Sequence, residues 1–421
     1  MSYCNYSPLK FVENLSFVRY GGTEAELKAA QIILAEIEAS GGKGEITDFE
    51  INASDYKSHV TKIVKPYELD INTVAFGMCG SIPAPGKDLK VLYAERGTDM
   101  DFLGYDDLSE YVVLVDMLSL DAYKALVKRN AAAIFVIMGK YYNDNGEAGL
   151  YNRNLRPKQL EQGVIPTFAI NAHDATELLR NEAELVHIEL EQTDGKATSR
   201  NVLAVIEGSE KPEESIVLTA HFDSLPVGPG AWDNATGSAA IMGLYKYFLE
   251  NQPKRTLRFI WCGSEEQGLL GSKAYIEQHE DLMDQIKFCF NFDMCGTILG
   301  PNSVMTTGDK TLEEFVALFL RETGYSAATR NGVHSSDSAP FADRGVPGIG
   351  ISRGTRSSEI HTSRDTIFPL GEKQLKANIE FAHKMISRVA NSVLLPVGTG
   401  MPDNMKAELD KYFQREPGSS K

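Results

Sequence analysis

The sequence predicts an α/β protein with an open, mostly parallel, twisted sheet that has helices on both faces. Three short runs at 215–220, 256–262 and 287–292 are rich in β-branched and aromatic residues, as expected of strands buried in such a sheet. An apolar run at 239–249 separates the first two strands, and a predicted helix from 268 to about 285 separates the last two. Alternation of strands and helices is typical of this fold class.

The chain is expected to contain more than one structural unit, because its 421 residues exceed the length of a typical domain. We assign residues 1–81 and 197–400 to one discontinuous domain. Residues 82–196 are assigned to a smaller inserted domain of α/β or β-rich structure, and residues 401–421 to a polar C-terminal surface tail. All candidate site residues follow residue 220, so the insert contains none of them.

Local patterns predict further elements in each part of the chain. Residues 23–40 form an amphipathic pattern that ends at Gly41-Gly42, which predicts a helix. Residues 346–352 are strand-like, and the tail contains a short predicted helix at 404–413. In the insert, helices near 120–129 and 173–181 alternate with predicted strands at 90–95, 111–116, 131–138, 166–170 and 185–190.

Polar residues follow each of the three buried strands. His221 follows the first, Glu265 and Glu266 follow the second after a Gly-Ser break, and Asp293 follows the third. In open α/β sheets, ligands bind beyond the carboxyl ends of the strands. We therefore expect these side chains to converge on one crevice.

The neighbours of these residues are open to two interpretations. Asp223 can fix the ring N–H of a metal-bound His221, although the same tripeptide also suits a capped strand end. Asp233 begins a helix, where an aspartate usually caps the first turn. Asn234 or Thr236 can cap instead, which leaves the carboxylate of Asp233 free to bridge two cations.

Five residues together match the needs of a two-metal hydrolytic centre. Two divalent cations require one bridging carboxylate, and each needs a nitrogen and a terminal carboxylate. A carboxylate at the end of an apolar strand is costly to bury unless it is paired or coordinated. The predicted ligands are His221, Asp233, Glu266, Asp293 and His361. Glu265, which is not among these ligands, is predicted to take a proton from the water that the metals hold.

These motifs resemble the M28 metallopeptidases. The resemblance is carried by His221-x-Asp223, Gly230-x-x-Asp233-Asn234-x-x-Gly237, Glu265-Glu266, Asn291-x-Asp293, the final His361 and the Ser-Asp-x-x-Pro-Phe segment at 336–341. It covers roughly residues 10–75 and 197–395. The 82–196 insert is similar to the protease-associated domain found in many such chains.

The resemblance implies a zinc-exopeptidase fold of the phosphorylase/hydrolase type with two Zn²⁺ per chain. His221, Asp233 and Asp293 would hold one ion, and Asp233, Glu266 and His361 the other. Co²⁺ or Mn²⁺ accepts the same ligands. The resemblance further implies hydrolysis of amino-terminal residues from peptides, with metal-bound water as the nucleophile. Glu265 would be the general base and acid, and Asp223 and Asp337 would support the ligands.

One residue departs from the family pattern. Many family aminopeptidases have a tyrosine before the last histidine, where it can stabilise the oxyanion, whereas this chain has Ile360. Tyr275, Tyr325 or a zinc ion alone remain as candidates for that role.

Alternative functions stay open at this point. A glutaminyl cyclase would use one zinc on the same fold, a carboxypeptidase for acidic residues would need basic groups such as Arg353 and Arg356, and a non-catalytic protein would usually lack ligands. The sequence at 350–354 also matches the Gly-x-Ser-x-Gly elbow of serine hydrolases. That elbow requires a following helix and an Asp before the His, but here a polar loop follows and His361 precedes Asp365.

Composition excludes several classes of partner. The 58 acidic and 42 basic residues give a net charge of −16, which repels nucleic acid and anionic lipid. No apolar run is long enough to span a membrane, and the start lacks the features of a signal peptide. The five cysteines are few and odd in number, which favours reduced thiols. We expect a cytoplasmic protein with peptide substrates, or a secreted one if a leader was removed; the sequence does not indicate its oligomeric state.

Overall fold

The computed structural model describes residues 3–139, 150–354 and 359–415. It divides into two compact units, formed by residues 1–49 with 198–421 and by residues 50–197. Two 22-residue strands, β1 (Gly44–Lys65) and β8 (Leu185–Ile206), each contribute residues to both units. This division assigns residues 50–81 to the second unit, whereas the sequence suggests an insert at 82–196. The assignment of that insert to a protease-associated domain stays a prediction.

The first unit is built on a mainly parallel sheet. Its strand order is β13 (Ala327–Asn331), β12 (Asn302–Thr307), β14 (Gly348–Arg353), β11 (Ile286–Phe292), β9 (Lys211–His221), β10 (Arg255–Cys262) and the last part of β8. The pairs β13–β12, β14–β11, β11–β9 and β9–β10 are parallel, whereas β12–β14 and β10–β8 are antiparallel. The predicted strands at 215–220, 256–262 and 287–292 are confirmed.

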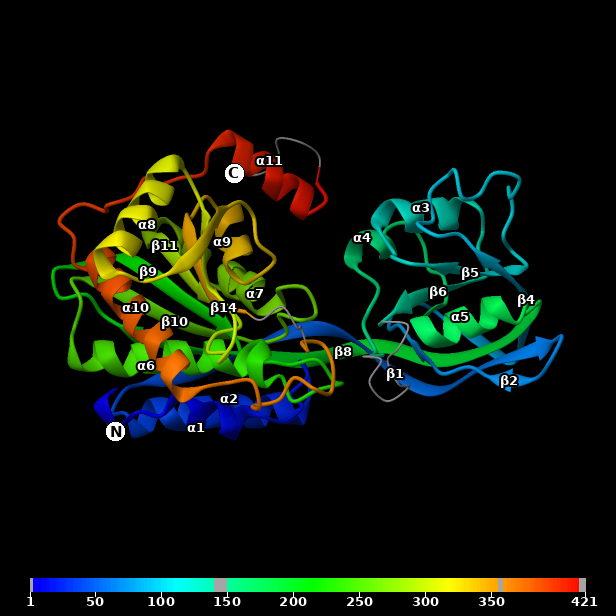
Figure 1. Ribbon diagram of the computed structural model, residues 1–421, viewed down its shortest axis with the longest axis horizontal. Helices are drawn as coiled ribbons and strands as arrows, with labels where there is room; N and C mark the ends of the chain where they lie inside the picture. The colour runs from blue at the N-terminus through cyan, green and yellow to red at the C-terminus, as the bar shows by residue number, and fades with distance from the viewer. Residues whose placement is uncertain (1–2, 140–149, 355–358, 416–421) are drawn as a thin grey trace. The chain divides into compact units, whose positions relative to one another are not determined.

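Alternate residues of the central strands enter two different cores. In β9, Ile216, Leu218 and Ala220 belong to one buried cluster, while Val217 belongs to another. The first cluster is covered by α1 (Pro8–Leu15), α2 (Glu24–Ala39), α6 (Thr236–Glu250), α8 (Lys310–Thr323) and α10 (Glu372–Ala390). The second is covered by α7 (Leu270–Gln278) and α9 (Ser338–Asp343), as Figure 1 shows. The predicted helices on both faces are therefore confirmed.

The local signals identified the helix at the amino end but missed a break further along. The N–H of Glu26 is capped by the side chain of Thr23, so α2 begins where the pattern predicts. The single helix predicted from 268 to about 285 is wrong, because α7 ends at Gln278 and a separate 3₁₀ segment follows at Glu280–Gln285. The break lies at His279. Its backbone leaves the helical region, and its ring Nδ1 binds the carbonyl of Tyr275 at 2.9 Å.

The second unit is a smaller α/β unit with its own core. The parallel strands β4 (Ile82–Tyr93), β5 (Tyr111–Val115), β6 (Ala133–Met138) and β7 (Thr167–Asn171) are flanked by β3 (Thr73–Ala75) and the first part of β8, both antiparallel to their neighbours; β2 (Leu69–Asp70) pairs with β1. Its helices are α3 (Leu120–Lys128), α4 (Pro157–Leu160) and α5 (Ala172–Arg180). Among the described residues, no helix is long and apolar enough to cross a membrane.

The C-terminal tail is more than a polar surface extension. The predicted helix is present as α11 (Asp403–Tyr412), and its Met405 and Leu409 are buried against Ala342. Arg415 forms an ion pair with Asp343. The amphipathic pattern of this helix therefore anchors residues 401–415 to the first unit.

Candidate metal centre

Three parallel strands bring their last residues to one edge of the sheet. In the register of β9 and β10, His221 lies opposite Cys262, three residues before Glu265. On the other side of β9, Asn291 of β11 lies opposite Thr219, so Asp293 emerges at the same edge. The predicted convergence of these segments is observed.

Two groups of side chains meet at this edge. One consists of His221, Asp233 and Asp293, and the other of Asp233, Glu266 and His361. Within each group, one potential ligand atom per residue lies within 4.8 Å of the others. Asp233 is shared by both groups.

The carboxylate of Asp233 faces two imidazoles with its two oxygens. Its Oδ1 lies 3.0 Å from His221 Nε2, and its Oδ2 lies 3.3 Å from His361 Nε2. Each imidazole nitrogen faces a second carboxylate. His221 Nε2 is 3.6 Å from Asp293 Oδ1, and His361 Nε2 is 3.4 Å from Glu266 Oε2. The two groups are thus built alike on either side of Asp233.

The donor set of this cluster fits divalent cations. Each ring nitrogen can donate one proton, so it cannot fully satisfy the two carboxylates that it faces. Asp293 Oδ1 is buried and has no hydrogen-bond partner within the described ranges, which is costly for a charged oxygen. A cation between a histidine nitrogen and two carboxylate oxygens satisfies all three atoms. Imidazole and carboxylate ligands are those that zinc takes in hydrolytic sites.

The charges of the cluster shift the pKa values of its members. Burial raises the pKa of Glu265 well above its usual range, although nearby His221 opposes the shift. Burial also raises the pKa of Glu266 to about 7, and repulsion from Asp233 adds to it. For Asp233, burial acts in the same direction, but hydrogen bonds from His221 and His361 prevail and lower its pKa.

Burial and hydrogen bonding also have opposite effects on the pKa of His361, the more exposed histidine of the cluster. Burial lowers the pKa of His361, but hydrogen bonds to Asp233 and Glu266 outweigh it and raise this pKa to about 11. The imidazole therefore retains its proton because the surrounding carboxylates attract positive charge. A bound metal cation would supply that charge in place of the proton.

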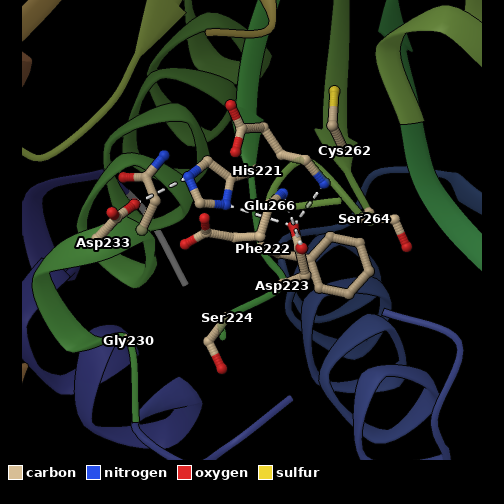
Figure 2. Close-up of polar contacts among 12 residues, drawn as sticks. His221, Phe222, Asp223, Ser224, Gly230, Asp233, Cys262, Ser264 and Glu266 are labelled. Atoms are coloured by element: carbon tan, nitrogen blue, oxygen red, sulfur yellow. Dashed lines mark hydrogen bonds and ion pairs between the residues drawn. The ribbon is translucent and has the colours of Figure 1, made fainter. Parts of the chain in front are cut away.

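Asp223 links the two strand ends. One of its oxygens lies 3.3 Å from His221 Nδ1, and its carboxylate accepts the main-chain N–H groups of Glu265 at 3.0 Å and Glu266 at 3.3 Å. Figure 2 shows the imidazole of His221 between the carboxylates of Asp223 and Asp233. Asp223 thus orients the ring and holds the loop that carries both glutamates.

The segment at 336–341 supports the site mainly through a serine. Ser336 Oγ donates to Asp293 Oδ2 at 2.8 Å and accepts from Asn291. Asp337 instead accepts from Ser272 at 2.7 Å, and burial raises its pKa to about 6. Sequence reasoning pointed to Asp337 but missed Ser336, whose adjacent position in the same motif was the available signal.

The loop before α6 is held so that Asp233 does not cap the helix. Asn234 Oδ1 accepts the N–H groups of Gly237 at 2.8 Å and Met294 at 3.1 Å. The carboxylate of Asp365 accepts the N–H groups of Trp232 at 2.8 Å and Asp233 at 3.1 Å. Asp365 was also missed, because its hydrogen bonds to the described residues go to main-chain groups and it belongs to no recognisable motif.

The other residues singled out in the sequence belong to neither group of candidate ligands. Tyr275 stacks on His279, and Tyr325 stacks on Phe381 with its hydroxyl bound to Asn378. Ser352 lies inside β14, opposite Ser303 of β12, and not at a turn.

The two arginines considered for an acidic substrate give no support to such a pocket. The guanidinium of Arg353 binds the carbonyl of Thr297 at 2.6 Å and the side chain of Asn302 at 3.0 Å. Arg356 lies outside the described residues.

The sequence is similar to known peptidases over the segment that holds the cluster. Residues 201–386 match the sequence profile of Peptidase family M28. Aminopeptidase YwaD of Bacillus subtilis is 24% identical over 394 residues, which cover 88% of this chain and 81% of that protein. The vacuolar membrane protease of Eremothecium gossypii is 28% identical over 185 residues, which cover 42% of this chain but only 18% of that protein.

Solved structures share the fold. BSAP, a zinc aminopeptidase from Bacillus subtilis, superposes with a TM-score of 0.76 at 20% identity, covering 95% of this chain and 98% of that one. An aminopeptidase from Aneurinibacillus sp. strain AM-1 superposes with a TM-score of 0.73 at 21% identity, covering 94% and 97%. The predicted fold class and the resemblance to M28 peptidases are therefore confirmed. Residues 201–386 match the model of Peptidase family M28, and together with the similarity to aminopeptidases this match identifies the chain as a peptide hydrolase.

Proposed function

We propose that this chain is a dizinc aminopeptidase that removes amino-terminal residues from peptides. The observation that carries this proposal is the geometry of Asp233, whose two oxygens face two histidines that each face a second carboxylate. Similarity to Aminopeptidase YwaD and to the zinc aminopeptidase BSAP supports both the reaction and the metal.

In this proposal the five side chains divide into two ligand sets. His221, Asp233 and Asp293 hold one cation, and Asp233, Glu266 and His361 hold the other. When bound, two zinc ions would activate water, polarise the scissile carbonyl and neutralise charge in the transition state. Cobalt or manganese would bind the same ligands.

Glu265 acts as the proton carrier. It belongs to neither ligand group, and its main-chain N–H is held by Asp223. Burial raises the pKa of Glu265 towards neutral pH, and a pKa near the working pH suits a group that first accepts a proton and later donates it. Glu265 takes a proton from the attacking water and delivers it to the nitrogen of the leaving amine.

The charge of the site favours the amino end of a peptide. Carboxylate oxygens that are not taken up by the cations would attract the substrate's ammonium group. A carboxypeptidase for acidic residues would need a free basic group, and Arg353 is bound to Thr297 and Asn302. A glutaminyl cyclase, which uses one zinc, would not need both ligand sets.

An assay with aminoacyl-coumarin substrates tests the proposal. Purified protein should release coumarin, lose activity with a chelator and regain it with zinc, while substrates with an acylated amino group should stay intact. Elemental analysis should give two zinc ions per chain. Cleavage of the blocked substrates would contradict an aminopeptidase. Cyclisation of amino-terminal glutamine with one zinc per chain would favour the glutaminyl cyclase.

The cellular location is a separate proposal. We retain the cytoplasmic location from the composition of the chain, and fractionation of the native host with an antibody would test it. Recovery of the protein in a membrane or secreted fraction would contradict it.

A further inference from the structure

A buried arginine lies behind the candidate metal centre. Arg19 is fully buried, and five hydrogen bonds from its guanidinium go to main-chain carbonyl oxygens. Burial lowers its pKa to about 10, while Asp223, Asp365 and other acidic groups of the site oppose the shift. The side chain therefore stays charged at neutral pH.

The bonds of Arg19 join two segments that carry candidate ligands. Its Nε donates to the carbonyl of Phe222, the residue after His221. Its Nη1 donates to Pro229, and its Nη2 donates to Gly230 at 2.7 Å, just ahead of Asp233. The remaining two bonds go to the carbonyls of Leu15 and Phe17 on its own segment.

A buried aspartate holds the same loop by its N–H groups. The carboxylate of Asp365 accepts from Trp232 and Asp233, and its main-chain carbonyl accepts from Ala231 at 3.2 Å. The guanidinium of Arg19 thus binds the carbonyls at the start of the loop, and the carboxylate of Asp365 binds the N–H groups at its end. This arrangement fixes the direction of the peptide groups that lead into Asp233.

The loop beside Arg19 contains a glycine with little space around it. Gly230 has a φ of +56°, a conformation that other residues rarely adopt. A Cβ at this position would lie 2.5 Å from Ser224 Cβ and 3.3 Å from Arg19 Nη1. A side chain at this position would therefore collide with Ser224 and crowd the guanidinium.

We propose that Arg19 and Asp365 are positioning residues that hold Asp233 between the two cation sites. The inference rests on the proposed metal centre. A bridging carboxylate must present its two oxygens to two sites at once, so a small rotation of the loop breaks one of the two contacts. Holding the loop by both its carbonyl and N–H groups prevents that rotation.

Four variants test this proposal. Arg19→Met removes the charge and the donors, Arg19→Lys keeps the charge but not the planar set of donors, and Asp365→Asn removes one acceptor. Arg255→Met is the matched control. Arg255 is also buried and binds the carbonyls of Val389, Ala390 and Ser392, but it lies at the start of β10, away from the cluster.

The measurements are zinc affinity, by competition with a chromophoric chelator, and the visible spectrum of the cobalt-loaded protein. Partners that orient metal ligands typically contribute 10- to 100-fold in affinity. We expect zinc binding to weaken by about that factor in the two Arg19 variants, and by about 10-fold in Asp365→Asn. The cobalt spectrum should change in all three, while Arg255→Met should bind zinc like the unchanged protein. If Arg19→Met does not fold, the other two variants still give the result.

Several outcomes would overturn the proposal. Unchanged zinc affinity and cobalt spectra in Arg19→Lys and Asp365→Asn would show that the loop needs no such support. An equal loss in Arg255→Met would show a general effect of stability. If the unchanged protein itself binds no zinc or cobalt, the proposed metal centre fails, which is a different result from failure of the positioning role.

Discussion

The adjacent glutamates at 265 and 266 should both lose activity on substitution by glutamine, but only the substitution at 266 should also lose zinc. Glu266 lies in a candidate ligand group, 3.4 Å from His361, whereas Glu265 belongs to neither group. Asp223 holds both residues by their main-chain N–H groups, so exchanging either side chain leaves these bonds in place. Glutamine has nearly the same shape as glutamate but cannot accept a proton at neutral pH.

For Glu265→Gln, we expect peptide hydrolysis to fall by about 10²- to 10⁴-fold, because this is the usual contribution of a general base. The factor corresponds to about 3 to 5 kcal/mol of transition-state stabilisation. Zinc content should remain at two ions per chain. For Glu266→Gln, activity should fall together with zinc affinity, and one ion should be lost during dialysis.

The metal-free protein gives a second readout for Glu265. Its folded-state pKa is raised, so its stabilising effect is present at low pH and is lost as the pH rises through that value. Metal-free Glu265→Gln should therefore melt at a higher temperature than the unchanged protein at pH 8 and at a similar temperature at pH 4. Kinetics with aminoacyl-coumarins, elemental analysis and calorimetry measure these quantities. Glu265→Gln that keeps full activity, or that loses zinc as Glu266→Gln does, would refute the assigned roles.

Further predictions address the support of the site and the tail. Ser336→Ala removes the hydrogen bond to Asp293 and should weaken zinc binding about 10-fold. Ser335→Ala, which loses a contact with Tyr412, should leave zinc binding unchanged, and the same zinc affinity in both variants would contradict this prediction. Burial raises the pKa values of Asp337 and Asp365 to about 6 and of Glu266 to about 7, so metal-free protein should lose stability as the pH rises from about 4 to 8. A melting temperature that rises over this range with a chelator present would show the wrong sign. Leu409→Ala should cost about 2 to 5 kcal/mol of unfolding free energy, because this side chain is fully buried, and a loss well under 1 kcal/mol in urea denaturation would show that α11 is not part of the core.

Patterns in the sequence were sufficient to predict the strands that carry the site. Buried strands of an α/β sheet are short apolar runs, and the residues at their carboxyl ends face the binding edge whatever the loops do. His221, Glu266 and Asp293 could therefore be assigned to that edge from the strand pattern alone. Asp233 and His361 lie in loops that no strand pattern marks, so they could be predicted only by considering which ligands a two-metal site requires.

The supporting residues could not be predicted in the same way. Arg19 and Asp365 act through main-chain carbonyl and N–H groups, which every residue possesses, so no residue pattern marks their partners. The break at His279 was missed because no glycine or proline marks it, and a histidine is compatible with a helix. The packing of α11 depends on Ala342, 63 positions before Met405, a contact that local periodicity does not show.

Anomalous diffraction at the zinc edge from crystals of the zinc-loaded protein tests the central claim most directly. We predict two peaks about 3.5 to 4 Å apart, as in other two-metal hydrolytic sites. One peak should lie among His221, Asp233 and Asp293, and the other among Asp233, Glu266 and His361. A single peak that Asp233 does not contact, or no peak at this edge of the sheet, would contradict the dizinc centre.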